Sequence, residues 1–190
     1  MDENLDFSVA MSRITHKLKL YLLLLGCTTL LLSSFHQGEP LPRDATYYKS
    51  KGFQVFSDYK LAVKCECTLQ DGSRQIKNNY DLAYLCASGS KAAHSRFITQ
   101  ILVKKNPVGL ASASATTKRE LEEKLFSRLG GKRVTFNGQR AIVTDNSTDG
   151  TNGRAISFMR NGATFSFIIY ADNNLDEKFS KFTNNIFFTE

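Results

Sequence analysis

The sequence predicts an α+β domain built on a mostly antiparallel sheet of about six to eight strands. Two Asn-Gly pairs each stand between strand-like runs, and helical patterns appear only after the first strands and again at the end of the chain. Strands grouped together in this way are typical of α+β proteins, whereas parallel sheets need alternating βαβ units. The 14 Phe and 7 Tyr among 190 residues supply a packed core. We therefore expect residues 52–190 to form one domain, with its C-terminal helix packed on the sheet.

The first part of this domain reads as a series of strands. Residues 61–69 alternate, with Leu61, Val63, Cys65, Cys67 and Leu69 on one face, which is the period of a half-buried strand. A turn is expected at Asp71-Gly72. The other strands predicted here are Phe53–Phe56, Leu82–Cys86 and Phe97–Val103.

The first helix has clear start and stop signals. Thr117 and Glu120 match a capping box, and Gly130-Gly131 end the run. Leucines follow the start at helical spacing, at positions 121, 125 and 129. The sequence therefore predicts a helix from about residue 117 to residue 129.

Two hairpins and a final helix complete the domain. Asn-Gly favours the type I′ turn, whose twist matches that of the flanking strands. The predicted hairpins are Lys132–Phe136 with Gln139–Thr144, and Arg154–Arg160 with Ala163–Tyr170. The closing helix is expected to begin near Asn174 and to place Leu175, Phe179, Phe182 and Ile186 on one side.

Residues 1–34 read as an export signal or signal anchor. Arg13, Lys17 and Lys19 stand before an uncharged, mainly apolar run of 16 residues, Leu20–Phe35. Basic residues followed by such a run form the n-region and h-region of an export signal. The run is close to the shortest that spans a bilayer. We expect an extracytoplasmic protein that is secreted or membrane-anchored, in the bacterial periplasm or envelope.

Three fates of this segment remain open, and each places the domain differently. Cleavage after Ser34 would release a secreted protein. Leu24-Leu25-Gly26-Cys27 resembles a lipobox, so Cys27 is a possible lipidation site. An uncleaved segment would anchor the protein in the membrane. Residues 35–51, which hold two of the three prolines, read as a tether to the domain.

The layout resembles the Mog1/PsbP-like superfamily, which includes many exported bacterial lipoproteins. The matching features are Gly52–Val55, the helix ending at Gly130-Gly131, the hairpin through Asn137–Ala141, the second hairpin and Phe179–Phe188, about 135 residues in all. The resemblance implies a sheet flanked by helices that serves binding and accessory roles. It carries no shared active site to this chain, and a fold does not by itself define a function.

The cysteines are the most informative residues in the domain. Cys65 and Cys67 share a strand face, and Cys86 lies in a later strand, so Cys86 can pair with only one of them. We favour a Cys67–Cys86 disulfide, because it closes the hairpin at Asp71-Gly72 more tightly. Cys65 is then left over, either buried or available to a partner.

A metal site is a weaker alternative for the same cysteines. Cys65, Cys67, Cys86 and His94 offer the Cys₃His ligand set that zinc accepts. Two ligands on one strand face are unusual geometry for zinc, and His94 falls in a Gly/Ser/Lys-rich loop. No motif supplies a nucleophile and an acid to accompany His94 in catalysis. The sequence predicts no cofactor, no metal and no catalytic residue.

The charge is basic but scattered. Residues 1–34 hold equal numbers of acidic and basic side chains, so the rest of the chain carries the whole net charge of +7. No basic run exceeds two residues, which argues against nucleic acid as a partner. Asp145, Asp149 and Asn146–Thr148 read as a solvated acidic loop between the hairpins.

The sequence is most consistent with an exported or membrane-tethered, non-enzymatic domain that binds an unknown protein or envelope component. Its contact with the membrane would be made through the N-terminal segment. Two other functions stay open: a basic surface that binds anionic lipid or nucleic acid, and a metal-dependent or hydrolytic enzyme.

Overall fold

The computed structural model describes residues 43–190, apart from residues 75, 77–79, 91, 108, 111 and 149. The predicted export segment, Cys27 and the first part of the predicted tether lie outside the described residues. Contacts divide the chain between Pro40 and Leu41, and the second unit, Leu41–Glu190, contains all the elements described below. Within the described part, no helix is both long and apolar enough to cross a membrane.

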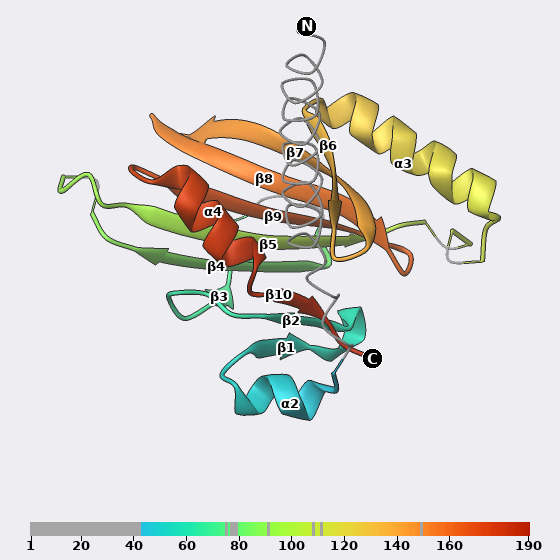
Figure 1. Cartoon of the computed structure of the whole chain (residues 1–190), viewed down its shortest axis with the longest axis horizontal. Helices are drawn as coiled ribbons and strands as arrows, with labels where there is room; N and C mark the ends of the chain where they lie inside the picture. Colours follow the sequence, from blue (N-terminus) through green and yellow to red (C-terminus); the bar gives the residue numbers. More distant parts are fainter. Residues whose placement is uncertain are drawn as a thin grey trace, which may run out of the picture. The chain divides into compact units, whose positions relative to one another are not determined.

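The main element is an antiparallel sheet of seven strands in the order β3-β4-β5-β9-β8-β7-β6 (Figure 1). The chain leaves the sheet after β5, passes through helix α3 (Ala115–Leu129), and returns through β6 to β9, so that β9 pairs with β5. The predicted α+β class and mostly antiparallel sheet are confirmed. The seven strands are β3 (Gln70–Asp71), β4 (Leu82–Ser88), β5 (Phe97–Lys105), β6 (Lys132–Phe136), β7 (Gln139–Thr148), β8 (Thr151–Arg160) and β9 (Ala163–Ala171).

Both predicted Asn-Gly hairpins form, with the turn geometry that the dipeptide favours. Asn137 and Gly138 have φ values of 45° and 72°, and Asn161 and Gly162 have φ values of 49° and 74°. Positive φ at both central residues is the requirement of a type I′ turn, and Asn and Gly tolerate it best.

The predicted acidic loop is instead part of a third hairpin. β7 continues through Thr148 and β8 begins at Thr151, so Asp145–Thr148 belong to a strand. Asp145 pairs directly with Arg154 across the hairpin. Asp149 lies outside the described residues. The sequence prediction missed this part of the strand because its side chains are polar and show no apolar alternation. The strand forms through backbone pairing, which does not depend on apolar side chains.

A second, three-stranded sheet brings the start and the end of the domain together. Its order is β1-β2-β10, formed by Gln54–Phe56, Leu61–Val63 and Ile186–Phe188. The prediction of one long strand over 61–69 is wrong, because β2 ends at Val63 and the chain then crosses to the large sheet. All three residues of β2 are buried, since this strand is central and is covered on both sides.

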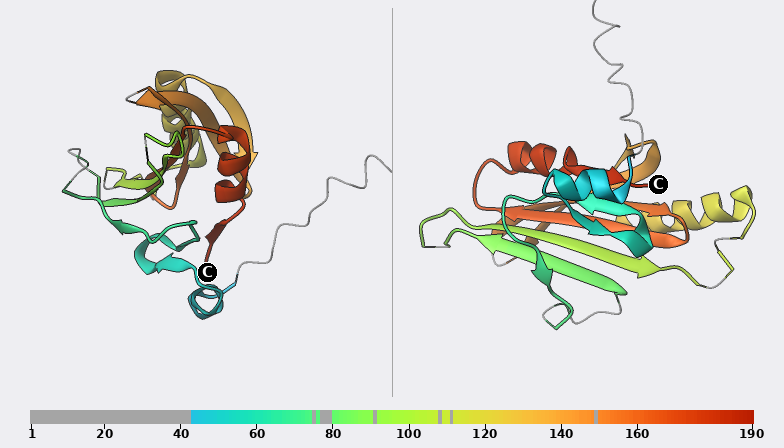
Figure 2. Two further views of the ribbon diagram at one scale, coloured as in Figure 1. Left: turned by 90° about the vertical axis from the view of Figure 1, so that its left-hand side faces the viewer. Right: turned by 90° about the horizontal axis from the view of Figure 1, so that it is seen from below.

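The core is formed by the large sheet together with helix α4 (Leu175–Thr183) and the small sheet. Helix α4 contacts β8 and β9 (Figure 1), and Figure 2 shows the strong curvature of the large sheet. The rings of Phe158 and Phe165 stack with centroids 5.1 Å apart, and Phe182 of α4 meets Phe167 edge-on at 6.2 Å. The predicted packing of the C-terminal helix is therefore observed, although Ile186 belongs to β10.

Part of the expected tether is folded. Residues 45–50 form helix α2, whose N-cap Asp44 accepts a hydrogen bond of 2.7 Å from the backbone N of Tyr47. Tyr48 is buried and stacks on Phe187 of β10, with centroids 5.3 Å apart. The folded part thus begins before Gly52, where we expected it to start.

Candidate binding groove beside helix α3

Helix α3 begins earlier than its sequence signals suggest. Its N-cap is Ser114, whose Oγ accepts a hydrogen bond of 3.1 Å from the backbone N of Thr117. The predicted capping box at Thr117 and Glu120 is therefore not the cap. Ser is as good an N-cap as Thr, and an early start adds nearly one helical turn beside the loop that follows β5.

One residue anchors this helix to the sheet. Phe126 is the only residue of α3 that is buried, with 2% of its surface exposed. The guanidinium carbons of Arg133 and Arg140 each lie 5.8 Å from the centre of its ring. Two of the three leucines that mark the helix in the sequence are exposed, Leu121 at 36% and Leu129 at 42%, and Leu125 is half-buried.

Ion pairs reinforce the anchor. Arg140 contacts both Glu122 and Glu123, at 2.5 Å in the first case, and Arg133 lies 2.6 Å from Glu123. Hydrogen bonds from Arg140 and Arg133 lower the pKa of Glu123, whereas burial raises the pKa of Glu122 despite its pairing with Arg140. These contacts hold the middle of the helix to β6 and β7.

The N-terminal half of α3 covers a cavity of about 700 Å³ at the end of the large sheet. Residues one helical turn apart on α3 form one wall, and the hairpin between β8 and β9 forms another. The residues around it are Asn106, Leu110, Ala115, Lys118, Arg119, Glu122, Arg140, Met159, Arg160, Asn161 and Gly162.

A second cavity of about 530 Å³ adjoins the first along the side of α3. The two share Asn106, Leu110 and Met159, and we call them together the α3 groove. The second cavity is the more apolar, since it includes Leu121 and Leu125. Its residues are Asn106, Pro107, Gly109, Leu110, Ala113, Thr117, Leu121, Lys124, Leu125, Arg128, Met159 and Thr164.

The charge of the α3 groove is strongly positive. Six basic side chains line its two cavities against the single carboxylate of Glu122: Lys118, Arg119, Lys124, Arg128, Arg140 and Arg160. Arg160 also lies over the ring of Phe188, 4.0 Å from its centre, and burial lowers its pKa. An arginine stays protonated in such a site, so its charge remains available to an anionic group.

Asn106 lies where the two cavities meet. Its Oδ1 accepts a hydrogen bond of 2.9 Å from Thr164, and its backbone N donates to the carbonyl of Gly162 at 2.7 Å. Its buried Nδ2 has no acceptor among the described residues. Buried donors are normally satisfied, so an unpaired amide of this kind is uncommon in a folded protein.

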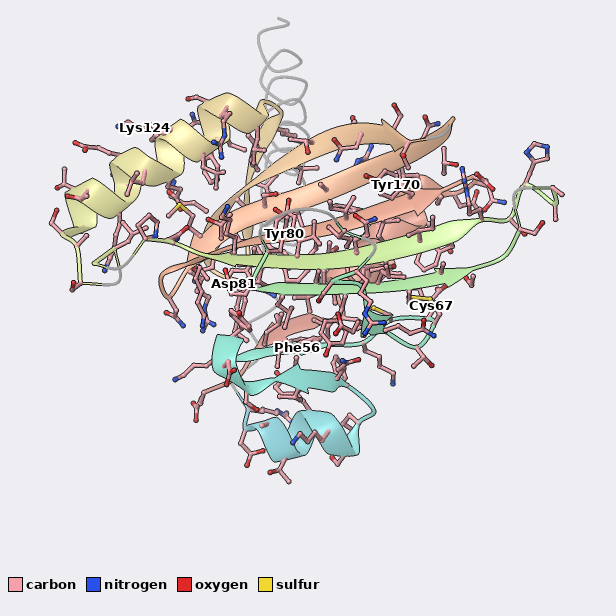
Figure 3. The ribbon with its side chains drawn as sticks, turned by 180° about the vertical axis from the view of Figure 1, so that it is seen from behind. Phe56, Cys67, Tyr80, Asp81, Lys124 and Tyr170 are labelled. Atoms are coloured by element: carbon pink, nitrogen blue, oxygen red, sulfur yellow. A yellow bond between two sulfur atoms is a disulfide. The ribbon has the colours of Figure 1, made fainter. Side chains whose placement is uncertain are left out.

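Among the residues singled out in the sequence, Cys67 and Cys86 form a disulfide, the pairing that we favoured. Their Cα atoms are 5.8 Å apart, and the bond joins the segment after β2 to β4. Figure 3 shows Cys67 at the end of the molecule opposite Lys124 of α3. The disulfide is therefore a structural link remote from the α3 groove.

Cys65 is a free thiol in an unreactive state. It is partly buried, and burial raises its pKa to about 12, with a smaller contribution from Glu66. It lines a cavity of about 340 Å³ with Lys178 and Lys181. Because the thiolate is the nucleophile and the metal ligand, a thiol with this pKa is poorly suited to either role near neutral pH.

His94 lies in an exposed turn with a φ of 47°. Its carbonyl accepts a hydrogen bond of 3.1 Å from Asn173. Within the part of the chain that the structure describes, no group of three or more His, Cys, Asp or Glu residues is placed to hold a metal ion. Two of the four residues of the zinc alternative are bonded to each other.

The acidic residues near β7 and α4 have arginine partners. Arg154 contacts Asp176 and, at 2.7 Å, Asp145. Asp172 accepts a hydrogen bond of 2.8 Å from the backbone N of Arg96. Its Oδ1 also lies 3.8 Å from Nε of Arg96, so these carboxylates neutralise neighbouring arginines.

Sequence reasoning missed the α3 groove. The signal available was the leucine stripe of α3 flanked by Lys124 and Arg128, which together describe a mixed apolar and basic face. Asn106, Leu110 and Met159 carry no such signal, because the fold brings them together from separate segments. The sequence matches no protein-family model and no curated protein.

Proposed function

We propose that this chain is an exported or membrane-tethered domain that binds a partner without catalysing a reaction, and that the α3 groove is its binding surface. One observation carries the proposal. A helix fixed mainly by Phe126 leaves two adjoining cavities of about 700 and 530 Å³ beside it. Concave sites with an apolar lining and a few polar groups are the usual places where proteins bind ligands.

Export is proposed from the N-terminal sequence, and the disulfide supports it. Cys67–Cys86 persists in an oxidising compartment and would be kept reduced in most cytosols. We place the domain in the bacterial periplasm or envelope, with the membrane reached through residues 1–34. Lipidation at Cys27, cleavage after Ser34 and retention of the anchor are the three routes to that location.

We also propose that the domain has a Mog1/PsbP-like fold. The order of elements supports this: strands, a helix, an antiparallel meander of four strands and a closing helix. Accessory and binding roles are common among such domains, and the α3 groove is the surface that we assign to such a role.

A dye titration tests the groove. The anionic apolar dye 8-anilinonaphthalene-1-sulfonate is added to residues 41–190, and its fluorescence is expected to rise as it enters the groove. Replacement of Leu121 and Leu125 by Glu adds negative charge to the groove and is expected to abolish most of this rise.

Leu129→Glu is the matched control, because Leu129 is an exposed leucine of the same helix that lines neither cavity. The proposal fails if the dye responds equally to the groove variant and the control. It also fails if the dye does not bind to a folded sample.

A further inference from the structure

We infer that the α3 groove takes an acidic amphipathic helix of a partner protein. This inference rests on the proposed function and adds the chemistry of the partner to it. The evidence is the charge of the groove, the spacing of its apolar residues and the shape of its wall.

The basic charge of the groove indicates an acidic partner. Arg140 is already neutralised by Glu122 and Glu123, and the other basic side chains that line the two cavities are Lys118, Arg119, Lys124, Arg128 and Arg160. Complementary charge steers association and excludes partners of the wrong sign. A second copy of this chain is disfavoured for the same reason, since the residues after 34 carry a net charge of +7.

The spacing of the apolar residues in the groove indicates that the partner segment is helical. Leu121 and Leu125 lie one turn apart on α3, about 5–6 Å along the helix axis. A partner helix with apolar residues at positions i, i+3, i+4 and i+7 presents matching side chains at that interval. An extended peptide would need free backbone groups to pair with, and the wall of the groove is a helix whose backbone is bonded internally.

The shape of the wall argues against a single lipid molecule. Leu121 is 36% exposed, so this side of the groove is open, whereas an acyl chain needs an enclosed apolar channel. The basic residues also extend along the helix from Lys118 to Arg128, about 15 Å at 1.5 Å per residue. Acidic residues spaced along a helix match this row, and a lone headgroup would contact one end of it.

Asn106 adds a specific contact. Its buried Nδ2 donor has no acceptor among the described residues and lies where the two cavities meet. Nδ2 is enclosed in the free protein, so a Glu or Asp side chain of the partner would accept this hydrogen bond only after the Asn106 side chain turns toward the cavity. Charge-assisted bonds of this kind are about twice as strong as neutral ones.

The test uses the full-length protein in phosphatidylcholine nanodiscs and a fluorescent 18-residue peptide. The peptide has leucines on one face and glutamates on the other, and a lactam bridge keeps it helical. Fluorescence anisotropy is expected to show saturable binding. A peptide with lysine in place of each glutamate is expected to bind at least about tenfold more weakly.

Variants locate the binding. L121E/L125E is expected to lower the affinity for the acidic peptide by about tenfold or more, and L129E is expected to lower it by less than about twofold. Asn106→Leu is expected to lower the affinity for the acidic peptide by a few fold. It should not change the affinity for a peptide that lacks the central glutamate. Raising NaCl should reduce the affinity in steps, because salt screens exposed charges.

Several results would overturn the inference. Equal binding of the acidic and basic peptides would remove the charge argument. Binding of phosphatidylglycerol vesicles without binding of the peptide would assign the groove to lipid. Dimerisation abolished by L121E/L125E would assign it to a second copy. If any of these results were found while the dye still bound in the groove, only the inference about the partner would fail. If the dye did not bind in the groove either, the proposed function would fail too.

Discussion

Cys67 and Cys86 hold the irregular segment between the two sheets, and their contribution can be measured. Their sequence separation is 19 residues, for which the loss of chain entropy in the unfolded state is worth roughly 3 kcal/mol. Replacing both with Ser is expected to lower the free energy of unfolding in urea by about that amount.

Cys65→Ser is the control for this pair, since Cys65 is not bonded. It should leave stability in urea within about 1 kcal/mol of the wild type. An equal loss in both variants would mean that the effect comes from cysteine burial and not from the bond.

The free thiol of Cys65 gives a pH-dependent signal. Its pKa is raised from 9.0 to about 12, so the folded protein keeps this thiol protonated where the unfolded chain ionises it. Alkylation by iodoacetamide should therefore be slow below pH 9 and should rise toward pH 12, with mass spectrometry as the readout. The stability contributed by the neutral thiol is present below pH 9 and is lost between pH 9 and 12.

A model thiol such as N-acetylcysteine provides the comparison, because its alkylation rate rises near its own lower pKa. If Cys65 in the folded protein reacts as fast as this model at pH 8, its pKa is not raised. Urea should bring the two rates together, since unfolding removes the burial.

Helix α3 is held to the sheet by a single buried side chain. A change at that side chain should therefore loosen the helix more than the sheet. Phe126→Ala removes a ring that is 2% exposed, and such a change costs about 3–5 kcal/mol in a well-packed site. We expect faster hydrogen exchange of the α3 amides and a loss of dye binding in the groove, with the exchange of β5 and β9 changed much less.

Leu129→Ala lies on the same helix at a residue that is 42% exposed, so it should change stability by less than about 0.5 kcal/mol. If the exchange of α3 were equally fast in both variants, Phe126 would not be the anchor.

Elements with local signals could be predicted from the sequence, and elements that depend on distant partners could not. Asn137-Gly138 and Asn161-Gly162 specify their turns through their own backbone preferences. β2 stops at Val63 because its second neighbour is β10, more than 120 residues later in the chain. No pattern within residues 61–69 contains that information.

The same limit applies to the sites. The Cys67–Cys86 pair was favoured for its closeness to the turn at Asp71-Gly72, and it is observed although Cys67 lies after the end of β2 and not on a strand. The α3 groove needs the loop after β5, the hairpin between β8 and β9 and the helix at once. Its leucines looked like an ordinary buried stripe, and only their exposure in the fold separates them from one.

At the scale of the whole molecule, the proposed export depends on the N-terminal segment. Leu23→Asp with Leu24→Asp places two charges in the uncharged run and is expected to keep the protein inside the cell. Fractionation followed by the mass of the mature N-terminus measures this. An acylated Cys27, an N-terminal Phe35 or an intact segment would identify the route.

Ser33→Asn with Ser34→Asn is the control, because it leaves the apolar run uncharged. It should preserve passage across the membrane, even if it alters cleavage after residue 34. Unchanged localisation of the Leu23/Leu24 variant would refute the assignment of residues 1–34 to export.

The small sheet has a consequence for how the protein is made. β2 receives one of its two neighbours from Ile186–Phe188, and the backbone of Thr189 bonds to that of Lys60. A ribosome must therefore have synthesised nearly all of the described chain before Leu61–Val63 can be enclosed. Until then the nascent polypeptide lacks its completed fold, which is the state that the proposed export through a narrow channel would require.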